Sequence, residues 1–384
     1  MEIFILNTSF QIVAVIDSFE SFIWTERYSD YGDFELYLSP NSPVTQYLQV
    51  DNYVEIRDSD RTMIIEEVQI DADVDNGHSI KISGRSLESI LYRRIVWKQT
   101  SISDKTVDEV IKQLLYDNVI EPTDSTRRID IFEYDELPNE HYIKTLNISQ
   151  IQFTGDNLFD VVKSICDAFD LGFRIVRSES ENTTLHFQLF VGENRSYDND
   201  DGSEQLKNPH VVFSPTFDNL LNSNYFESNK NLKTVTLVAG EGEGADRIMT
   251  EVPSVNGAGT GLSRRELFTD ARDLSKSTQT QDENGNMTEN TLSDDEYNDV
   301  LTERGTEKLA EYCATESFEG SIDPSTEYVY GTPESIKMGI ADYSIGDTVQ
   351  VENEYGMGCR CRVTEFIRSE DSSGYETYPT FMKI

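Results

Sequence analysis

A glycine-rich stretch is the first candidate for chemistry in this sequence. VTLVAGEGEGADRI, residues 235–248, matches the Gly-x-Gly-x-x-Ala spacing of a dinucleotide-binding loop through Gly240, Gly242 and Ala245, and a strand-like run precedes it. Such a loop needs a helix after it, because the helix N-terminus receives the pyrophosphate. DRIMTEVPS follows instead, which has the pattern of a strand, and two glutamates in the loop would repel a phosphate. We predict a hairpin loop here and, for the same reason, a loop at residues 256–266, NGAGTGLSRRE.

Acidic residues at regular spacing suggest a second kind of site. Asp71, Asp73 and Asp75 resemble the start of an EF-hand calcium loop. However, the glycine comes one place late at Gly77, and Ile82 stands where the bidentate glutamate should be. A hairpin turn at residues 75–77 is therefore the better interpretation.

A further acidic cluster is equally unspecific. Its members lie in one polar loop and are Asp198, Asp200, Asp201 and Glu204. They could hold a cation weakly, but a charged and solvated turn is the ordinary explanation. With 71 Asp and Glu residues in the chain, no single carboxylate pair can be singled out as glycosidase-like. We expect no structural metal, no cofactor and no catalytic residue.

The four cysteines lack the spacing of a redox or zinc site. Cys359 and Cys361 on one strand would put both thiols on the same face, with one residue between them instead of two, so we predict core packing. Cys166 and Cys313 fall on the apolar faces of predicted helices, where buried free thiols are common. This usage favours synthesis in the cytoplasm without a disulfide framework.

Histidines offer no better candidate. They are scattered through loops and strands, as His78, His141, His186 and His210. None has His-x-x-x-His spacing or a nucleophile motif beside it, so we assign none a catalytic or metal-binding role.

The elements that would position these residues are mostly strands in the first 85 residues. Apolar and polar residues alternate through residues 34–38, with a similar run at residues 22–28, which predicts a β-hairpin around Gly32. The opening MEIFILNTSFQIVAVID predicts another strand pair. Six or seven short antiparallel strands with tight turns indicate a small barrel or sandwich. A short helix capped by Ser86 is expected to follow.

The next hundred residues have a different character. SDKTVDEVIKQLLYDNV predicts a helix with Ser103 or Asp104 as its N-cap. GDNLFDVVKSICDAFDLGFRIVR predicts a second helix, capped by Asp156 or Asn157 and ended by Gly172, and then a strand. With one more strand after it, this region is expected to be an α+β domain.

A second β-rich region begins near residue 211. VVFSPTFDNLL and YSIGDTVQV, near its two ends, predict paired strands. Between them, one helix is expected over residues 294–318. Its apolar positions are Tyr297, Val300, Leu301, Leu309, Tyr312 and Cys313. Two β-rich modules thus flank a mixed one.

Charge limits the partners of the chain. With 32 Lys and Arg against 71 Asp and Glu, the formal net charge is −39, which repels DNA, RNA and anionic membranes. A solvated surface is the simplest reason for such acidity. The N-terminus lacks the basic segment and cleavage site of a signal peptide, and no run approaches the roughly 18 apolar residues of a membrane span, so a soluble protein is expected.

These stretches, taken in order, resemble the phage tail hub family, which includes the trimeric central hub of contractile tails and the N-terminal module of siphophage tail-associated proteins. The resemblance spans nearly the whole chain. The residues that carry it are VAVIDSFESFIWTERYSDYGDFELYL (13–38), GRSLESILYRRIV (84–96), GDNLFDVVKSICDAFDLGFRI (155–175), VAGEGEGADR (238–247), GLSRRELFTD (261–270) and YSIGDTVQV (343–351).

The resemblance implies a fold that is mainly β with α+β, in which two tube-forming antiparallel β-barrel domains flank a mixed helix and strand domain. Residues 1–99 would form the first barrel domain and residues 100–208 the α+β domain. Residues 209–384 would form the second barrel domain, with a helical insertion near residues 294–318 and C-terminal strands.

The implied function is structural. Three chains, each with two barrels, would form a pseudo-sixfold ring that joins the tail tube to the baseplate or tail tip of a virion and lets DNA pass without binding it. The implied partners are two further copies of the chain, the distal tail and tail tube proteins, and the tail-tip or receptor-binding proteins. The protein would be made in the host cytoplasm.

Two alternatives remain open from the sequence. One is an acidic carbohydrate- or cell-wall-active enzyme of the tail tip, and the other is a receptor-binding adhesin. The family pattern often continues into a peptidoglycan hydrolase domain, whereas this sequence stops at Ile384, so we expect no lytic activity and no enzyme.

Overall fold

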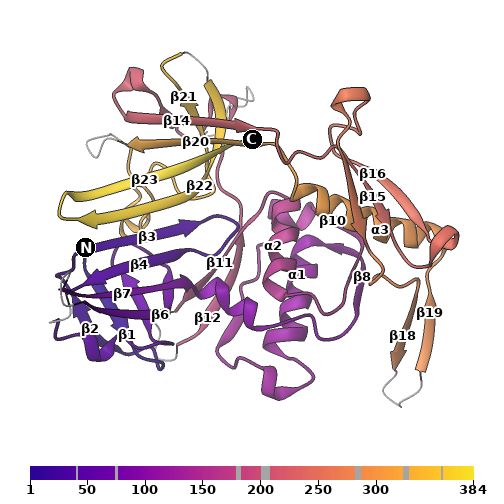
Figure 1. Cartoon of the computed structure of the whole chain (residues 1–384), viewed down its shortest axis with the longest axis horizontal. Coiled ribbons are helices and arrows are strands. Elements are labelled where there is room, and N and C mark those ends of the chain that lie inside the picture. Colours follow the sequence, from indigo (N-terminus) through magenta and orange to yellow (C-terminus); the bar gives the residue numbers. More distant parts are fainter. Residues whose placement is uncertain are drawn as a thin grey trace.

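The fold is mainly β with a few helices, as expected (Figure 1). The computed structural model describes residues 1–39, 42–73, 77–178, 183–199, 208–281, 287–322, 328–355 and 358–384. The predicted turn at residues 75–77 lies mostly outside these ranges, as do Asp200, Asp201 and Glu204.

One large sheet joins the start of the chain to its end (Figure 1). Its strands follow the order β14-β20-β23-β22-β3-β4-β7-β6-β5-β1-β2, while β21 pairs with β22 and with β13. The early strands are β1 (Ile3–Leu6), β2 (Ile12–Ile16), β3 (Ser21–Arg27), β4 (Asp33–Leu38), β5 (Tyr53–Ile56), β6 (Thr62–Asp73) and β7 (Gly77–Ser86). The late strands are β13 (Val212–Phe213), β14 (Leu220–Ser228), β20 (Thr315–Ile322), β21 (Thr348–Glu352), β22 (Gly358–Asp371) and β23 (Gly374–Lys383).

The hairpin predicted around Gly32 is confirmed as β3 and β4. Phe22 pairs with Leu36 and Trp24 with Phe34 across the two strands. These side chains are buried together in the core of the first seven strands, because alternate residues of a strand point to the same face. Closure of either β-rich region into a barrel stays a prediction.

The mixed region packs around one apolar core. Its elements are β8 (Thr100–Thr106), α1 (Val107–Leu115), β9 (Phe132–Tyr134), β10 (Asn147–Phe153), α2 (Leu158–Ala168), β11 (Gly172–Arg177) and β12 (Leu185–Phe190). The N-cap expected at Ser103 or Asp104 is wrong, because both residues belong to β8, which pairs with β10. Helix α1 begins after Thr106, whose backbone N–H donates to the Glu109 carboxylate at 3.1 Å in a capping box.

Helix α2 begins as predicted and ends earlier. The Asn157 side chain accepts a hydrogen bond from the Phe159 N–H at 2.9 Å, which confirms the N-cap. The helix ends at Ala168, and Gly172 opens β11 instead of ending the helix. A Cβ on Gly172 would lie 2.4 Å from the ring of Tyr28, which directly follows β3, so glycine is required where this residue approaches β11.

The short helix after β7 is a 3₁₀ helix, Leu87–Arg93. Ser86 does not cap it with its side chain, because the Ser86 hydroxyl accepts a hydrogen bond from the Gly32 N–H at 2.7 Å. Leu87, Ile90 and Leu91 are buried, as their spacing predicts.

A smaller group of elements is inserted in the sequence between β14 and β20 of the large sheet. It contains β15 (Val235–Ala239), β16 (Met249–Pro253), β17 (Glu266–Asp270), β18 (Ser277–Gln281), β19 (Met287–Thr291) and α3 (Asp294–Ala310), and a last short helix, α4 (Pro333–Met338), follows β20. The helix expected over residues 294–318 stops at Ala310, because residues 315–322 pair with β14 as β20. Tyr297, Val300, Leu301 and Leu309 are buried as predicted.

Helix α3 also packs against α2 and β10, and this contact buries an acidic residue. The Glu307 carboxylate has one oxygen without a hydrogen-bond partner, and its other oxygen lies 3.6 Å from the Arg304 Nε. Burial raises the pKa of Glu307 to about 7, although the Arg304 charge opposes this shift.

Replacing Glu307 by Gln tests this burial. Because the folded-state pKa of about 7 lies above the ordinary value of 4.5, Glu307 costs no stability below pH 4.5, and the cost grows as the pH rises to about 7. We expect Glu307→Gln to be more stable than the parent chain by about 2 kcal/mol in urea unfolding at pH 8, with a much smaller gain at pH 5.5. The exposed Glu311→Gln should show no such gain. A gain that does not change with pH would contradict the assignment.

Candidate assembly site

The two β-rich regions meet where β22 pairs with β3. Seven residues of each strand are in register, from Glu365 opposite Arg27 to Asp371 opposite Ser21. Backbone hydrogen bonds therefore hold the late strands directly beside the first hairpin. No other strand of the first seven pairs with a late strand in the described part of the chain.

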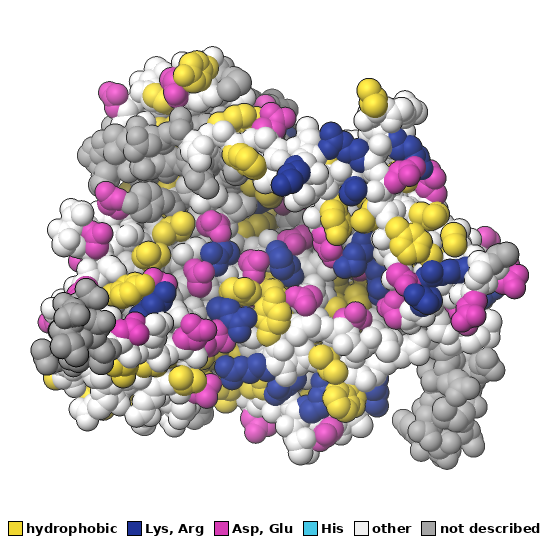
Figure 2. All heavy atoms as spheres, in the orientation of Figure 1, with side chains coloured by type: hydrophobic (Ala, Val, Ile, Leu, Met, Phe, Trp, Pro, Cys, Tyr) yellow, Lys and Arg dark blue, Asp and Glu magenta, His cyan; other side chains and the backbone are white. Residues whose placement is uncertain are grey.

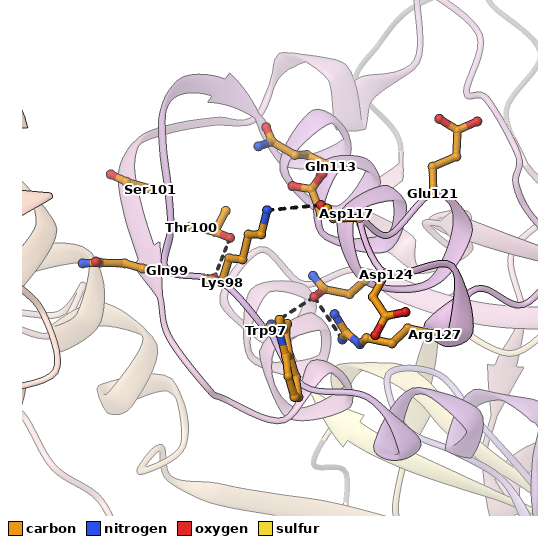
Figure 3. A pocket seen from close by; sticks show the side chains of 12 residues that line it. Trp97, Lys98, Gln99, Thr100, Ser101, Gln113, Asp117, Glu121, Asp124 and Arg127 are labelled. Carbon is orange, nitrogen blue, oxygen red and sulfur yellow. Dashed lines mark hydrogen bonds between the residues drawn. The ribbon is translucent and has the colours of Figure 1, made fainter. Parts of the chain in front are cut away.

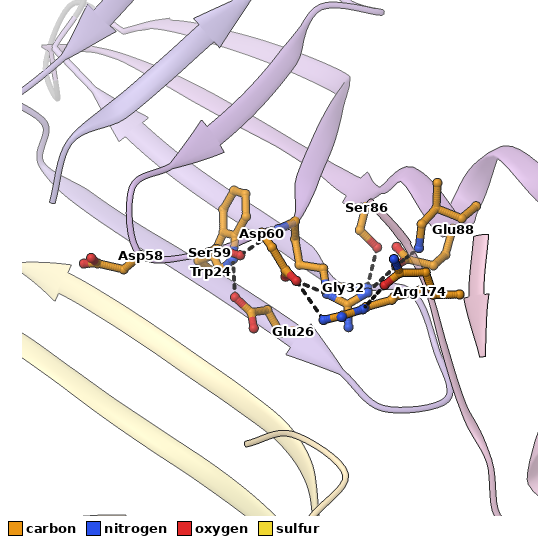
Figure 4. A network of polar contacts seen from close by, with 12 residues as sticks. Trp24, Glu26, Gly32, Asp58, Ser59, Asp60, Ser86, Glu88 and Arg174 are labelled. Atoms are coloured by element: carbon orange, nitrogen blue, oxygen red, sulfur yellow. Dashed lines mark hydrogen bonds and ion pairs between the residues drawn. The ribbon is translucent and has the colours of Figure 1, made fainter. Parts of the chain in front are cut away.

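A buried ion pair lies within this joint. Arg368 on β22 donates to Glu26 on β3 at 2.6 Å, and the two side chains are 1% and 6% exposed. The Trp24 Nε1–H donates to the same carboxylate at 3.2 Å (Figure 4). The Tyr330 hydroxyl donates to its other oxygen at 3.3 Å. Burial alone would raise the pKa of Glu26, but the charges of Arg368 and Arg61 hold it below its ordinary value. Glu26 is therefore ionised and fully paired.

A second buried pair extends this network to the mixed region. Arg61 donates to Glu88 at 2.5 Å, and the same Glu88 oxygen accepts the Ile175 N–H at 2.9 Å. Beside it, Arg174 on β11 pairs with Asp60 at 2.7 Å (Figure 4). The buried Arg61–Glu88 pair and the partly exposed Arg174–Asp60 pair therefore fix the mixed region against the first strands.

The two ends of the large sheet are free edges. Among the described residues, β14 pairs only with β20, and β2 pairs only with β1. Tyr225 and Phe226 on β14 are 39% and 50% exposed. Because adjacent residues of a strand point to opposite faces, both faces of β14 are exposed to solvent at these two residues. Ile12 and Val15 on β2 are 61% and 49% exposed. Open edges with large apolar side chains are typical of surfaces that another chain covers.

The small sheet β16-β15-β17 offers a further apolar surface. Its inner face packs on α3 through Val238 and Val252. On the strands of this sheet, Leu237, Met249 and Phe268 remain 40%, 48% and 56% exposed. Hydrophobic side chains gather over these strands, with arginine and acidic side chains around them (Figure 2).

The glycine-rich motif is a hairpin loop, as predicted. Residues 240–248 join β15 to β16, which pair antiparallel, so no helix follows as a phosphate site requires. The Tyr297 hydroxyl accepts the Glu241 N–H at 2.8 Å and would lie only 2.5 Å from a Cβ on Gly240. The first glycine is thus explained by packing. Residues 256–266 also connect two strands, as predicted.

The acidic candidates lie apart from one another. Asp71 and Asp73 lie on β6, and Asp198 lies in a 3₁₀ turn of residues 197–199. Within the described ranges, no three His, Cys, Asp or Glu side chains gather closely enough to hold a metal ion.

The cysteines divide into packed and exposed thiols. The Cys359 and Cys361 sulfurs lie 3.3 Å apart on one face of β22, beside the core of the late strands, as predicted. Cys166 is buried on α2. The expectation of a buried Cys313 is wrong, because α3 ends before it and its side chain is exposed.

The histidines have local roles. The His186 Nδ1 lies 2.8 Å from an Asp135 oxygen, His141 accepts the Ile143 N–H at the start of a 3₁₀ turn, and the His210 ring packs edge-on against Tyr197. His78 lies on β7. In the part of the chain that the structure describes, no helix is long and apolar enough to cross a membrane.

The ion pair in the joint can be tested by a double-mutant cycle. Arg368→Met or Glu26→Leu alone leaves one buried charge unpaired, so each should cost about 3–5 kcal/mol in urea unfolding. The double variant should recover at least about 2 kcal/mol of the summed loss, because no unpaired charge remains. Arg264→Met, which breaks exposed pairs with Glu251 and Glu266, should leave the free energy of unfolding nearly unchanged. Additive losses in the double variant would show that the two charges do not interact.

Two solved phage tail proteins share the fold of this chain. No curated protein matches the sequence. The 43 kDa tail protein of prophage MuSo2 from Shewanella oneidensis has a similar structure, with a TM-score of 0.54 and 12% identity over 100% of this chain and 98% of that chain. The tail protein from Neisseria meningitidis MC58 is similar with a TM-score of 0.53 and 12% identity, over 100% of this chain and 96% of that chain. At this identity the two structures establish a shared fold.

The sequence itself establishes the family. The model of the Siphovirus ReqiPepy6 Gp37-like protein matches residues 2–381, which is nearly the whole chain. The chain therefore belongs to the Siphovirus ReqiPepy6 Gp37-like protein family.

Proposed function

We propose that the chain is a structural, non-enzymatic tail hub, of which three copies form a ring that joins the tail tube to the baseplate or tail tip. The observation that carries this proposal is the pairing of β22 with β3, which places two β-rich regions side by side in one sheet. Three such chains would present six β-rich regions around an axis. Such a ring has threefold symmetry, which fits a threefold tail tip, and approximate sixfold symmetry, which fits a sixfold tail tube.

The free sheet edges supply the contacts between copies. Phe226 on β14 and Ile12 on β2 lie at opposite ends of the sheet, so a head-to-tail contact between neighbours can close a ring. Closure would remove both edges, which otherwise invite aggregation. Residues 1–99 and 209–384 would form the two tube-type barrels, and residues 100–208 would form the mixed domain.

The negative charge suits a passage for DNA. Each contact between a cationic side chain and a phosphate slows the movement of DNA, whereas a chain with a net charge of −39 repels DNA overall. We assign the ring to the baseplate or tip of the virion tail. Its neighbours would be the distal tail and tail tube proteins on one side and tail-tip or receptor-binding proteins on the other.

The oligomeric state tests this proposal directly. Mass photometry and electron-microscopy class averages of the full chain should show rings of three times the 43.8 kDa chain mass, with a central hole. Phe226→Asp should abolish the rings, because it places a charge at the free edge of β14, while circular dichroism remains that of the parent chain.

The matched control is Phe217→Asp, which changes a phenylalanine that is 58% exposed outside any strand. This variant should still form rings. A monomer at every concentration, or rings of a different number of copies, would contradict the trimeric hub.

A further inference from the structure

A cavity of about 550 Å³ opens on the mixed region, away from the joint between the β-rich regions (Figure 3). One wall comes from the loop before β8, which carries Trp97 and Lys98. The opposite wall comes from the end of α1 and the turns after it, which carry Gln113, Asp117 and Arg127.

Trp97 is exposed in a way that the fold does not require. The chain has two tryptophans, and Trp24 is fully buried, whereas Trp97 is 63% exposed. Indole rings contribute most to stability when buried, so an outward tryptophan beside a polar cavity is unusual for a purely structural role. Exposed aromatic residues in concave sites are typical of ligand contacts.

The position of Trp97 is fixed by buried neighbours. Its backbone N–H donates to the Asn118 Oδ1 at 3.1 Å, and Asn118, which is only 2% exposed, donates in turn to the Leu114 carbonyl at 2.9 Å. The preceding Val96 is fully buried in the core of the mixed region. The indole is therefore presented by a rigid backbone, which lowers the entropic cost of binding.

Arg127 fixes the ring from one side. Its guanidinium carbon lies 4.9 Å from the centre of the Trp97 ring, and its Nη2 donates to the Ile95 carbonyl at 2.9 Å. This contact holds one ring face by a cation–π interaction. With 63% of Trp97 still exposed, the ring keeps a large apolar surface for a ligand.

The rest of the cavity is lined by groups that form directed hydrogen bonds. Asp117, Glu121 and Asp124 supply carboxylate oxygens, although one Asp124 oxygen already accepts the Thr126 N–H at 3.0 Å (Figure 3). The Gln113 side-chain oxygen accepts a hydrogen bond from Lys105 at 2.7 Å, so Gln113 offers a ligand its amide N–H groups. The two cations are already engaged, since Lys98 donates to the Thr123 hydroxyl at 3.2 Å and Arg127 donates to a backbone carbonyl. Three carboxylates against two engaged cations disfavour an anionic ligand.

We propose that this cavity binds a saccharide that is uncharged or carries amino groups, with a sugar ring stacked on Trp97. A sugar ring presents an apolar C–H face that suits the indole and a rim of hydroxyl groups that suits the carboxylates and the Gln113 amide. A purely apolar ligand would leave those groups unpaired, and a phosphorylated one would face the carboxylates. This binding role is independent of ring formation.

A glycan array tests the proposal on the full chain. Fluorescently labelled protein would be applied to immobilised neutral, amine-bearing and anionic oligosaccharides. We expect binding within the neutral and amine-bearing classes, weakened about tenfold or more by Trp97→Ala and less by Trp97→Phe, which keeps an aromatic ring. Bound saccharide should also protect Trp97 fluorescence from acrylamide, since Trp24 is already shielded.

The matched control is Tyr142→Ala, because Tyr142 lies in the same region and is 60% exposed but does not line the cavity. This variant should bind as the parent chain does. Asp117→Asn distinguishes the two ligand classes. It should weaken the binding of an amine-bearing glycan several-fold and change the affinity for a neutral glycan by about twofold or less.

Three results would overturn the proposal: no glycan bound at millimolar concentration, binding confined to anionic glycans, or binding that Trp97→Ala leaves unchanged. Circular dichroism of each variant would exclude unfolding as a cause. Mass photometry of Trp97→Ala should still show rings, so a failure of saccharide binding and a failure of ring assembly give different results.

Discussion

The ion pair between Glu26 and Arg368 is the constraint on which the architecture depends. The two residues are 342 positions apart in sequence, yet they meet on neighbouring strands in the interior. Apolar side chains could bury a similar area, so the pair contributes specificity of alignment more than stability. A slip of β22 by one residue would turn Arg368 to the other face of the sheet and leave Glu26 unpaired. Only one alignment of the two β-rich regions satisfies both charges.

This alignment also positions the mixed region. The loop after β5 carries both Asp60, which pairs with Arg174, and Arg61, which pairs with Glu88. Arg368 donates to the Asp58 carbonyl at 3.0 Å, so that the same loop contacts the late strands as well. One turn therefore contacts all three parts of the chain. The free edges and the Trp97 cavity lie outside this network, on surfaces that another molecule can reach.

Local patterns predicted the local elements of this fold. The alternation around Gly32 and the Asn157 cap depend on neighbours within a few residues, and both predictions are confirmed. The Thr106 cap and the end of α3 were missed, because strand pairing with distant segments overrides helix propensity at both places. The role of Gly172 was missed for a related reason, since it is set by the ring of Tyr28, which is distant in sequence and follows β3.

The candidate sites were harder to predict than the fold. Glu26 and Arg368 are two of 103 charged residues, and no spacing connects them. Their pairing depends on β3 meeting β22, which no local pattern encodes. Trp97 did carry a signal, because a tryptophan between Val96 and Lys98 in a polar stretch does not fit an apolar stripe. Only the structure shows that its neighbours form a cavity.

The pairing of β3 with β22 has a consequence for synthesis on the ribosome. The outer edge of β3 has no partner until residues 358–371 have emerged, long after the first hairpin can form. During that interval the edge of β3, which carries the apolar residues Phe22 and Trp24, has no neighbouring strand on this side. The strand that later pairs with it is far away in sequence. Translation thus acts as a timer: the early strands cannot acquire this neighbour before residues 358–371 are made.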